Sequence, residues 1–233
     1  MTHILQIDAS ARPGLAGIHN HGSHSRTLSH QFISRWQQQR PQDTLTHRDI
    51  GLNPPSIINH AWIEAAFTQA DNREARMQEA LLESDQLVDE LIAADILIIG
   101  TPLYNFGMPA ALKAWVDQVI RLNRTVAIDE SDSDDHYITM LSDRPRHAII
   151  LAARGGTEQS MGGEMEHMNY LERHMATALE FMGITRFHYV AIEGQEAGGE
   201  VLAASVAQAL QQVDALVDAL QQKLNSTTLH EPA

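Results

Sequence analysis

The feature of this sequence that most constrains its fold is the unbroken apolar run Ile96-Leu97-Ile98-Ile99, which lies between Asp95 and Gly100. A strand made of such residues has no polar face to turn toward water. It is therefore typical of the centre of a parallel sheet that is covered on both faces. Four other short segments are predicted to be strands, at residues 3–8, 44–49, 147–153 and 187–192.

Helical periodicity separates these strands, as in Leu28, Phe32 and Trp36, which recur on one face of a predicted helix that starts near Ser25. Further helices are expected at about 72–93, 109–124, 164–182 and 198–223, with a partly helical segment at 57–71 and a long polar connection at 125–146. This alternation predicts a doubly wound, five-stranded parallel sheet in the order 2-1-3-4-5, because right-handed crossovers place helices on both faces. Residues 1–224 are expected to form a single domain, and residues 225–233 a flexible C-terminal tail.

Composition narrows the possible functions. The chain has 233 residues and no cysteine, which excludes disulfides, thiolate metal sites and cysteine nucleophiles. Its formal net charge of −14 disfavours nucleic acid and anionic membranes as partners, and an anionic ligand would need a locally positive pocket. No stretch resembles a signal peptide or a membrane span, so a cytoplasmic location is expected.

In a sheet of this order, ligands bind beyond the carboxyl ends of the strands, between the first and third strands. We therefore expect the loops after the first, third and fourth strands to meet. The first loop contains Ser10 and the triplet Ser23-His24-Ser25, with two arginines, Arg12 and Arg26. A helix N-terminus offers free N–H groups and about half a positive charge, so a phosphate is a suitable ligand there. The alternative is that these serines are only helix caps.

The second and third loops suit a flat ligand. Leu103-Tyr104-Asn105-Phe106 places aromatic and amide groups at a strand end, and Gly107 is expected to adopt a backbone conformation closed to other residues. The third loop, Arg154-Gly155-Gly156, would let its backbone approach a ligand closely. The alternatives are an aromatic turn that packs on its own helix and a flexible connection between strand and helix.

Together these stretches resemble the FMN-dependent NADH-azoreductases and their quinone-reductase relatives, over about residues 3 to 220. The most specific similarity is Pro102-Leu103-Tyr104-Asn105-Phe106-Gly107-Met108-Pro109, followed by Leu112-Lys113. The resemblance implies a flavodoxin-like fold that holds FMN non-covalently. It implies phosphate contacts from Ser10, Ser23, His24 and Ser25, ring contacts from Leu103, Tyr104, Asn105 and Phe106, and contacts at the other end of the ring from Ala153, Arg154, Gly155 and Gly156.

The resemblance also implies the reaction and the partners. Such enzymes work by ping-pong hydride transfer, in which NADH or NADPH reduces the flavin and a quinone or azo acceptor then takes the hydride. They act as homodimers with each active site near the subunit interface. Since the flavin carries the chemistry, neither a catalytic side chain nor a metal is assigned. The alternatives are a flavodoxin-type electron carrier and a flavin-binding regulatory subunit.

Two segments depart from the family pattern. Residues 11–22 are longer than expected and contain His19 and His21, and the sequence assigns them no role. The acidic run from Asp129 to Asp135 is interpreted as a solvated loop, with the hypothesis that it forms a lid over the acceptor site.

Overall fold

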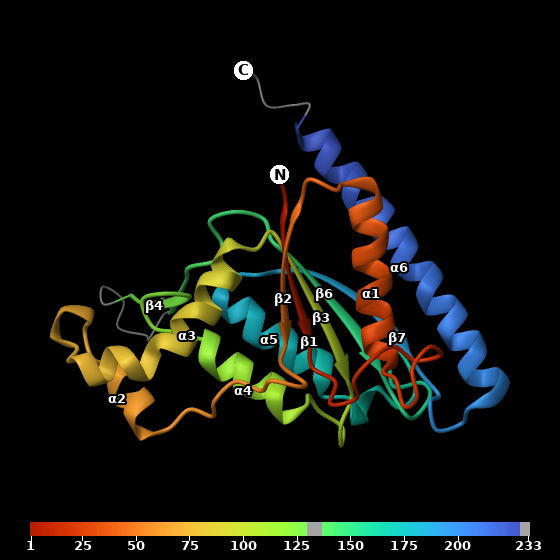
Figure 1. Cartoon of the computed structure of the whole chain (residues 1–233), viewed down its shortest axis with the longest axis horizontal. Coiled ribbons are helices and arrows are strands. Elements are labelled where there is room, and N and C mark those ends of the chain that lie inside the picture. Colours follow the sequence, from red (N-terminus) through yellow and green to blue (C-terminus); the bar gives the residue numbers. More distant parts are fainter. Residues whose placement is uncertain (130–136, 229–233) are drawn as a thin grey trace.

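A computed structural model describes residues 1–129 and 137–228 of the chain, and it contains the predicted five-stranded parallel sheet. The strand order is β2-β1-β3-β6-β7, which is the predicted order 2-1-3-4-5 once the sheet strands alone are counted (Figure 1). All four strand pairings within this sheet are parallel. The strands are β1 (His3–Asp8), β2 (Thr44–Asp49), β3 (Ile96–Pro102), β6 (His147–Ala153) and β7 (Arg186–Ile192).

The helices have identifiable start and stop signals. The side chain of Ser23 caps α1 by accepting a hydrogen bond from the backbone N–H of Arg26. Gly183, in the left-handed conformation, ends α5. The helices are α1 (His24–Gln39), α2 (His60–Phe67), α3 (Ala75–Ala93), α4 (Ala110–Val119), α5 (Leu171–Met182) and α6 (Gly199–Thr228), with short 3-10 turns at Ala70–Asn72 and Glu166–Met168.

Alternate residues of the central strands face two separate hydrophobic clusters. Leu5 and Ile7 of β1 pack in one cluster with side chains of α3, α4 and α5, including Trp115. Ile4 of the same strand packs in the other cluster with side chains of α1 and α6. Figure 1 shows the two groups of helices on opposite sides of the sheet. The predicted stripe of Leu28, Phe32 and Trp36 is completely buried, which fixes α1 against the sheet.

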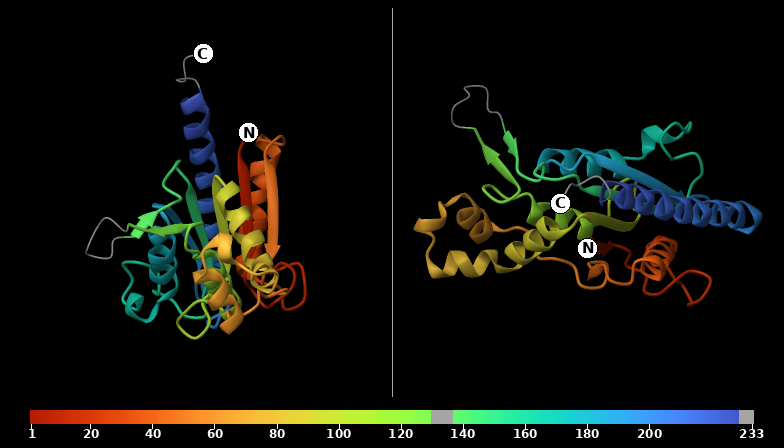
Figure 2. Two further views of the ribbon diagram at one scale, coloured as in Figure 1. Left: turned by 90° about the vertical axis from the view of Figure 1, so that its left-hand side faces the viewer. Right: turned by 90° about the horizontal axis from the view of Figure 1, so that it is seen from above.

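The predicted connection at 125–146 is the main difference between expectation and structure. It contains a two-stranded antiparallel sheet, β4 (Val126–Ile128) and β5 (Tyr137–Thr139), which extends away from the main sheet (Figure 2). Three-residue strands are too short for their alternation to stand out in a sequence. Residues 130–135 of the acidic run lie outside the described residues, so the lid hypothesis stays a prediction.

Several helix boundaries also differ from the prediction, and the helix expected at 109–124 ends at Val119. The expected helix at 164–182 begins only at Leu171, because a loop with a 3-10 turn precedes it. The last helix continues to Thr228, so the first residues of the predicted tail are helical, and residues 229–233 lie outside the description. No helix within residues 1–129 and 137–228 is both long and apolar enough to cross a membrane.

Candidate functional site

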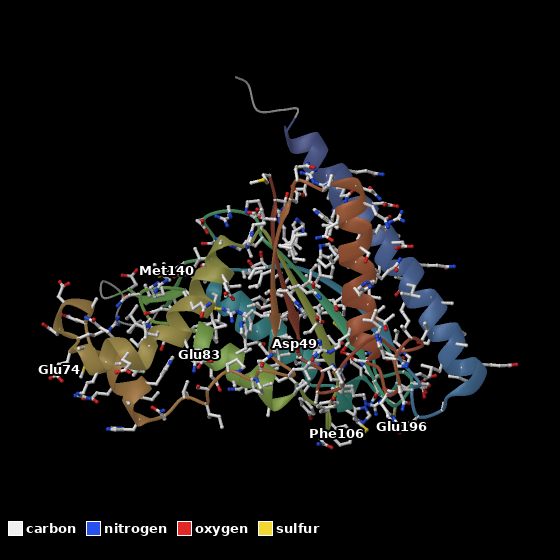
Figure 3. All side chains as sticks on the ribbon, in the orientation of Figure 1. Asp49, Glu74, Glu83, Phe106, Met140 and Glu196 are labelled. Carbon is white, nitrogen blue, oxygen red and sulfur yellow. The ribbon has the colours of Figure 1, made fainter. Side chains whose placement is uncertain are left out.

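The loops after β1 and β3 meet at a small cleft beyond the carboxyl ends of the strands, as the sequence predicts, and of the predicted third segment only Ala153, the last residue of β6, lines this cleft. Five of the predicted site residues line this cleft, namely Ser10, Ser23, His24, Tyr104 and Ala153. The remaining lining residues are Arg12, Gly22, Pro102 and Gln195. Figure 3 shows the labelled residues Phe106 and Glu196 at this same end of the molecule.

The first loop presents hydroxyl groups at the start of α1. Ser10 and Ser23 are both buried, and the Ser23 hydroxyl lies 3.1 Å from that of Ser25. Ser25 is completely buried and does not line the cleft, and its predicted contact with a phosphate stays a prediction. No acidic residue stands in the first turn of α1. The positive end of this helix is therefore open to an anion.

The two arginines of the first loop have different environments. Arg26 is buried and forms two hydrogen bonds of 2.7 and 2.6 Å with the carboxylate of Asp49, so its charge is neutralised. Arg12 is exposed at the cleft, and no carboxylate of the described chain lies within ion-pair distance of it. Burial and the charge of Arg12 together lower the pKa of His24, so that imidazole is uncharged at neutral pH. Arg12 is thus the cation that the cleft offers.

The second loop is a tight two-residue turn. The backbone groups of Tyr104 and Gly107 exchange hydrogen bonds of 3.0 Å, and Asn105 and Phe106 between them both have positive φ. These are the features of a type I′ turn. The expectation for Gly107 was wrong, since its φ is not positive. The two residues before it, Asn105 and Phe106, adopt the positive φ instead. Tyr104 and Phe106 remain 38% and 48% exposed.

Neighbouring loops hold this turn in place. The backbone N–H of Leu103 donates to the carbonyl of Ala153 at 2.9 Å, which joins the second loop to the third. The carbonyl of Phe106 accepts a hydrogen bond of 2.9 Å from the backbone N–H of Tyr170, at the start of α5. The aromatic side chains of the turn therefore project from a fixed backbone and leave their faces open.

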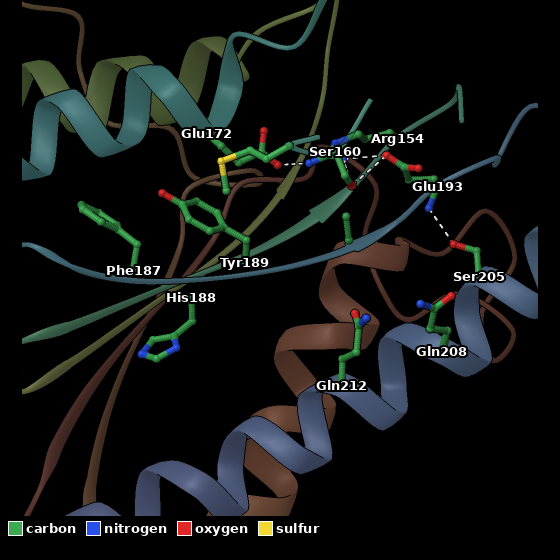
Figure 4. Close-up of a pocket in the computed structure, with 12 residues that line it drawn as sticks. Arg154, Ser160, Glu172, Phe187, His188, Tyr189, Glu193, Ser205, Gln208 and Gln212 are labelled. Atoms are coloured by element: carbon green, nitrogen blue, oxygen red, sulfur yellow. Dashed lines mark hydrogen bonds and ion pairs between the residues drawn. The ribbon is translucent and has the colours of Figure 1, made fainter. Parts of the chain in front are cut away.

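The third loop begins with an arginine whose side chain is paired within the protein. The side chain of Arg154 is 2% exposed and forms ion pairs with Glu172 and, at 2.7 Å, with Glu193 (Figure 4). It also donates to the hydroxyl of Ser160 at 2.6 Å. This cluster borders a hollow of about 500 Å³ along β7, outside the cleft. Both terminal nitrogens of the Arg154 side chain are thus paired within the protein, and the predicted contact of Arg154 with a flavin stays a prediction.

Gly155 and Gly156 do not line the cleft, and their predicted contact with a flavin stays a prediction. A Cβ atom on Gly155 would lie 2.5 Å from a carboxylate oxygen of Glu196, so this glycine gives room to the loop after β7. That loop also supplies Gln195 to the cleft. Gln195 was not predicted from the sequence, because β7 lies two positions beyond β3, at which the strand order reverses.

Beneath the first loop, the buried carboxylate of Asp8 is fully bonded. It accepts hydrogen bonds from Gln6 at 2.8 Å and from Ser29 at 2.6 Å. It also lies 2.8 Å from a ring nitrogen of His47, and this hydrogen bond raises the pKa of His47. These bonds hold the carboxylate within the protein. In the cleft it would repel an anion.

Comparison with known proteins gives a consistent set of relatives. Residues 2–217 match the family model described as flavodoxin-like fold. The chain is 37% identical over 220 residues to FMN-dependent NADH:quinone oxidoreductase 2 of Idiomarina loihiensis, an alignment that covers 94% of this chain and 91% of that protein. It is 40% identical over 214 residues to FMN-dependent NADH:quinone oxidoreductase 1 of Pseudomonas fluorescens, with 91% and 97% covered.

Among solved structures, the crystal structure of an azoreductase from Bacillus anthracis matches with a TM-score of 0.80. It covers 94% of this chain and 100% of that chain at 21% sequence identity. At this identity the likeness shows a shared fold.

Proposed function

Since the chain belongs to the flavodoxin-like fold family, we propose that it is an FMN-dependent NAD(P)H:quinone oxidoreductase that also accepts azo compounds. Its curated relatives, named as FMN-dependent NADH:quinone oxidoreductases, cover nearly the whole chain at 37–40% identity. When bound in this cleft, FMN would supply the redox chemistry, which is hydride transfer from a nicotinamide to the acceptor. The protein supplies position, charge and exclusion of water.

The observation that carries the proposal is the charge of the cleft. In a chain with a formal net charge of −14, none of the described residues that line the cleft is acidic, and one of them is Arg12. Together with Ser10, Ser23 and the N-terminus of α1, this set fits the phosphate of FMN. We assign these groups to the phosphate, with His24 as a neutral neighbour.

The ring of FMN would lie along the second loop. Leu103 to Phe106 form a fixed turn whose exposed aromatic side chains suit a flat heterocycle, and free backbone groups can bond its edge. Ala153 and the backbone of Arg154, Gly155 and Gly156 would contact the far end of the ring. No side chain of these loops needs to act as a nucleophile, in agreement with the absence of cysteine.

We further propose that the protein is a homodimer whose partner subunit covers the ring site. Large apolar side chains are exposed at the second loop and on the neighbouring segments, including Phe106, Met161 and Tyr170. A second exposed set, Ile57, Ile63 and Phe67, lies on and before α2. Burying such side chains favours association. We also propose that residues 1–224 form one domain and that the protein is cytoplasmic, in keeping with a chain free of disulfides.

The proposal is tested on the purified protein. We expect visible absorption bands of bound flavin that bleach on addition of NADH under anaerobic conditions and return on addition of a quinone or an azo dye. A single-electron carrier of flavodoxin type would not be bleached directly by NADH. A colourless protein that fails to bind added FMN would refute the function, and repeating the titration with NADPH would give the preferred nicotinamide.

A further inference from the structure

We propose that Arg26 is a positioning residue that holds the turn from Ser10 to Arg12 in the shape that receives the FMN phosphate, and that it does not bind the phosphate itself. This inference rests on the proposed function, because it concerns the same cleft. It starts from a contrast between two cations of one loop. Arg12 lines the cleft, whereas Arg26 is 6% exposed and lies behind the loop.

The guanidinium of Arg26 is almost fully bonded to the protein. Its Nε donates to the backbone carbonyl of Arg12 at 2.9 Å, and its Nη2 donates to the backbone carbonyl of Ser10 at 2.8 Å. Both terminal nitrogens donate to Asp49, and Nη1 lies 3.8 Å from a carboxylate oxygen of Asp8. Four of the five N–H groups of an arginine are thereby directed at protein oxygens.

These bonds decide which way the turn presents its polar groups. Carbonyl oxygens that point into an anion site repel the anion, whereas N–H and O–H groups attract it. Arg26 draws the carbonyls of Ser10 and Arg12 toward the interior. The Ser10 hydroxyl, which accepts a hydrogen bond of 3.2 Å from the N–H of Arg12, stays at the cleft. The planar guanidinium is needed because it reaches two carbonyls and a carboxylate at once.

Asp49 anchors this arrangement to the end of β2. Its carboxylate accepts both hydrogen bonds from Arg26 and a third from the backbone N–H of Leu52 at 3.1 Å. Burial by itself raises the pKa of Asp49, but the hydrogen bonds and charge of Arg26 outweigh burial and hold that pKa below its usual value. The pair is therefore ionised at neutral pH, and it leaves no net charge for a phosphate to use.

The test compares FMN with riboflavin, which has the same ring and no phosphate. Each is titrated into the flavin-free full chain, and binding is followed by quenching of flavin fluorescence. In Arg26→Lys and Arg26→Met we expect FMN affinity to fall roughly tenfold or more, and riboflavin affinity to stay within about twofold. The matched control is Arg35→Met, because Arg35 lies on the same helix and also forms two hydrogen bonds with one aspartate, Asp218, away from the cleft. It should change neither affinity.

A third variant distinguishes a positioning role of Arg26 from direct binding of the phosphate by its charge. Asp49→Asn removes a negative charge near the cleft and releases Arg26. If Arg26 bound the phosphate directly, FMN would bind more tightly to Asp49→Asn, and Arg26→Lys would keep most of the affinity. Positioning predicts weaker FMN binding in both variants.

Tighter binding in Asp49→Asn, or an equal loss for FMN and riboflavin in the Arg26 variants, would overturn the inference. Failure of the proposed site itself would look different. The unmodified chain would then bind FMN no more tightly than riboflavin, or the double variant Ser10→Ala/Ser23→Ala would keep the full preference for FMN.

Discussion

Replacing Arg154 with methionine should destabilise the protein by about 3–5 kcal/mol, the range found when one member of a buried ion pair is removed. The side chains of Arg154 and Glu172 are 2% and 5% exposed, so water replaces the missing cation poorly. The carboxylate of Glu172 would keep only its hydrogen bond from Asn169, and that of Glu193 would lose its 2.7 Å partner. The loss comes from leaving charge buried without compensation.

The assay is urea unfolding of the flavin-free protein at neutral pH, because bound cofactor would add its own stabilisation. The matched control is Arg173→Met, since Arg173 on α5 is 73% exposed and lies 3.7 Å from Glu166; it should cost less than about 1 kcal/mol. Adding Glu172→Met to Arg154→Met should recover part of the loss, because the unpaired charge is then removed as well. A loss below about 1 kcal/mol for Arg154→Met, with no recovery in the double variant, would refute the reasoning.

Three further outcomes follow from the structure. Ser10→Ala combined with Ser23→Ala should weaken FMN binding roughly 100-fold, because two hydrogen bonds from hydroxyl groups to the charged phosphate are lost. Equilibrium dialysis against FMN measures the affinity. A change below about threefold would contradict the assignment of these serines to the phosphate. Gly51→Ala should disrupt the first loop, because its Cβ would lie 2.1 Å from the carbonyl oxygen of Ser10, whereas Gly107→Ala, with nothing within 4 Å, should be tolerated; thermal unfolding of both variants tests the contrast. Burial lowers the pKa of His147 to about 4, below the unfolded value of about 6.5, so its contribution to stability is complete above pH 6.5 and is lost as the pH falls toward 4. Between pH 6.5 and pH 4, the free energy of unfolding of His147→Gln should therefore fall by roughly 1 kcal/mol less than that of the unmodified chain, after allowance for solvent screening. An equal fall in both proteins would show that His147 does not cause the pH dependence.

The sheet was predictable because its signals are local. A strand such as β3, with every residue buried, needs only apolar residues in succession, and α1 carries both its buried stripe and its Ser23 cap within a few positions. The strand order then followed from the alternation of strands and helices, and it brought the loops after β1 and β3 together with the end of β6.

The parts that were missed depend on distant partners or on backbone geometry. The ion pairs of Arg154 were not predicted, because its partners Glu172 and Glu193 lie on α5 and just after the end of β7, and no local sequence pattern indicates such pairs. The second loop contains one glycine, Gly107, and the sequence therefore suggested that the positive φ would be found there. The turn instead places positive φ at Asn105 and Phe106, because a type I′ turn needs both of its central residues in that region.

The position of β1 in the middle of the sheet affects how the chain folds during its synthesis. His3 pairs with Thr44 and Ile4 with Ile96, so the centre of the sheet cannot form until β3 has left the ribosome. The cover of α1 arrives later still, because its Arg35 bonds to Asp218 near the end of α6. The apolar cluster that α1 forms with the sheet is thus completed only when Val213 and Val217 of α6 have been made, and nascent chains that stop before α6 should depend on chaperones.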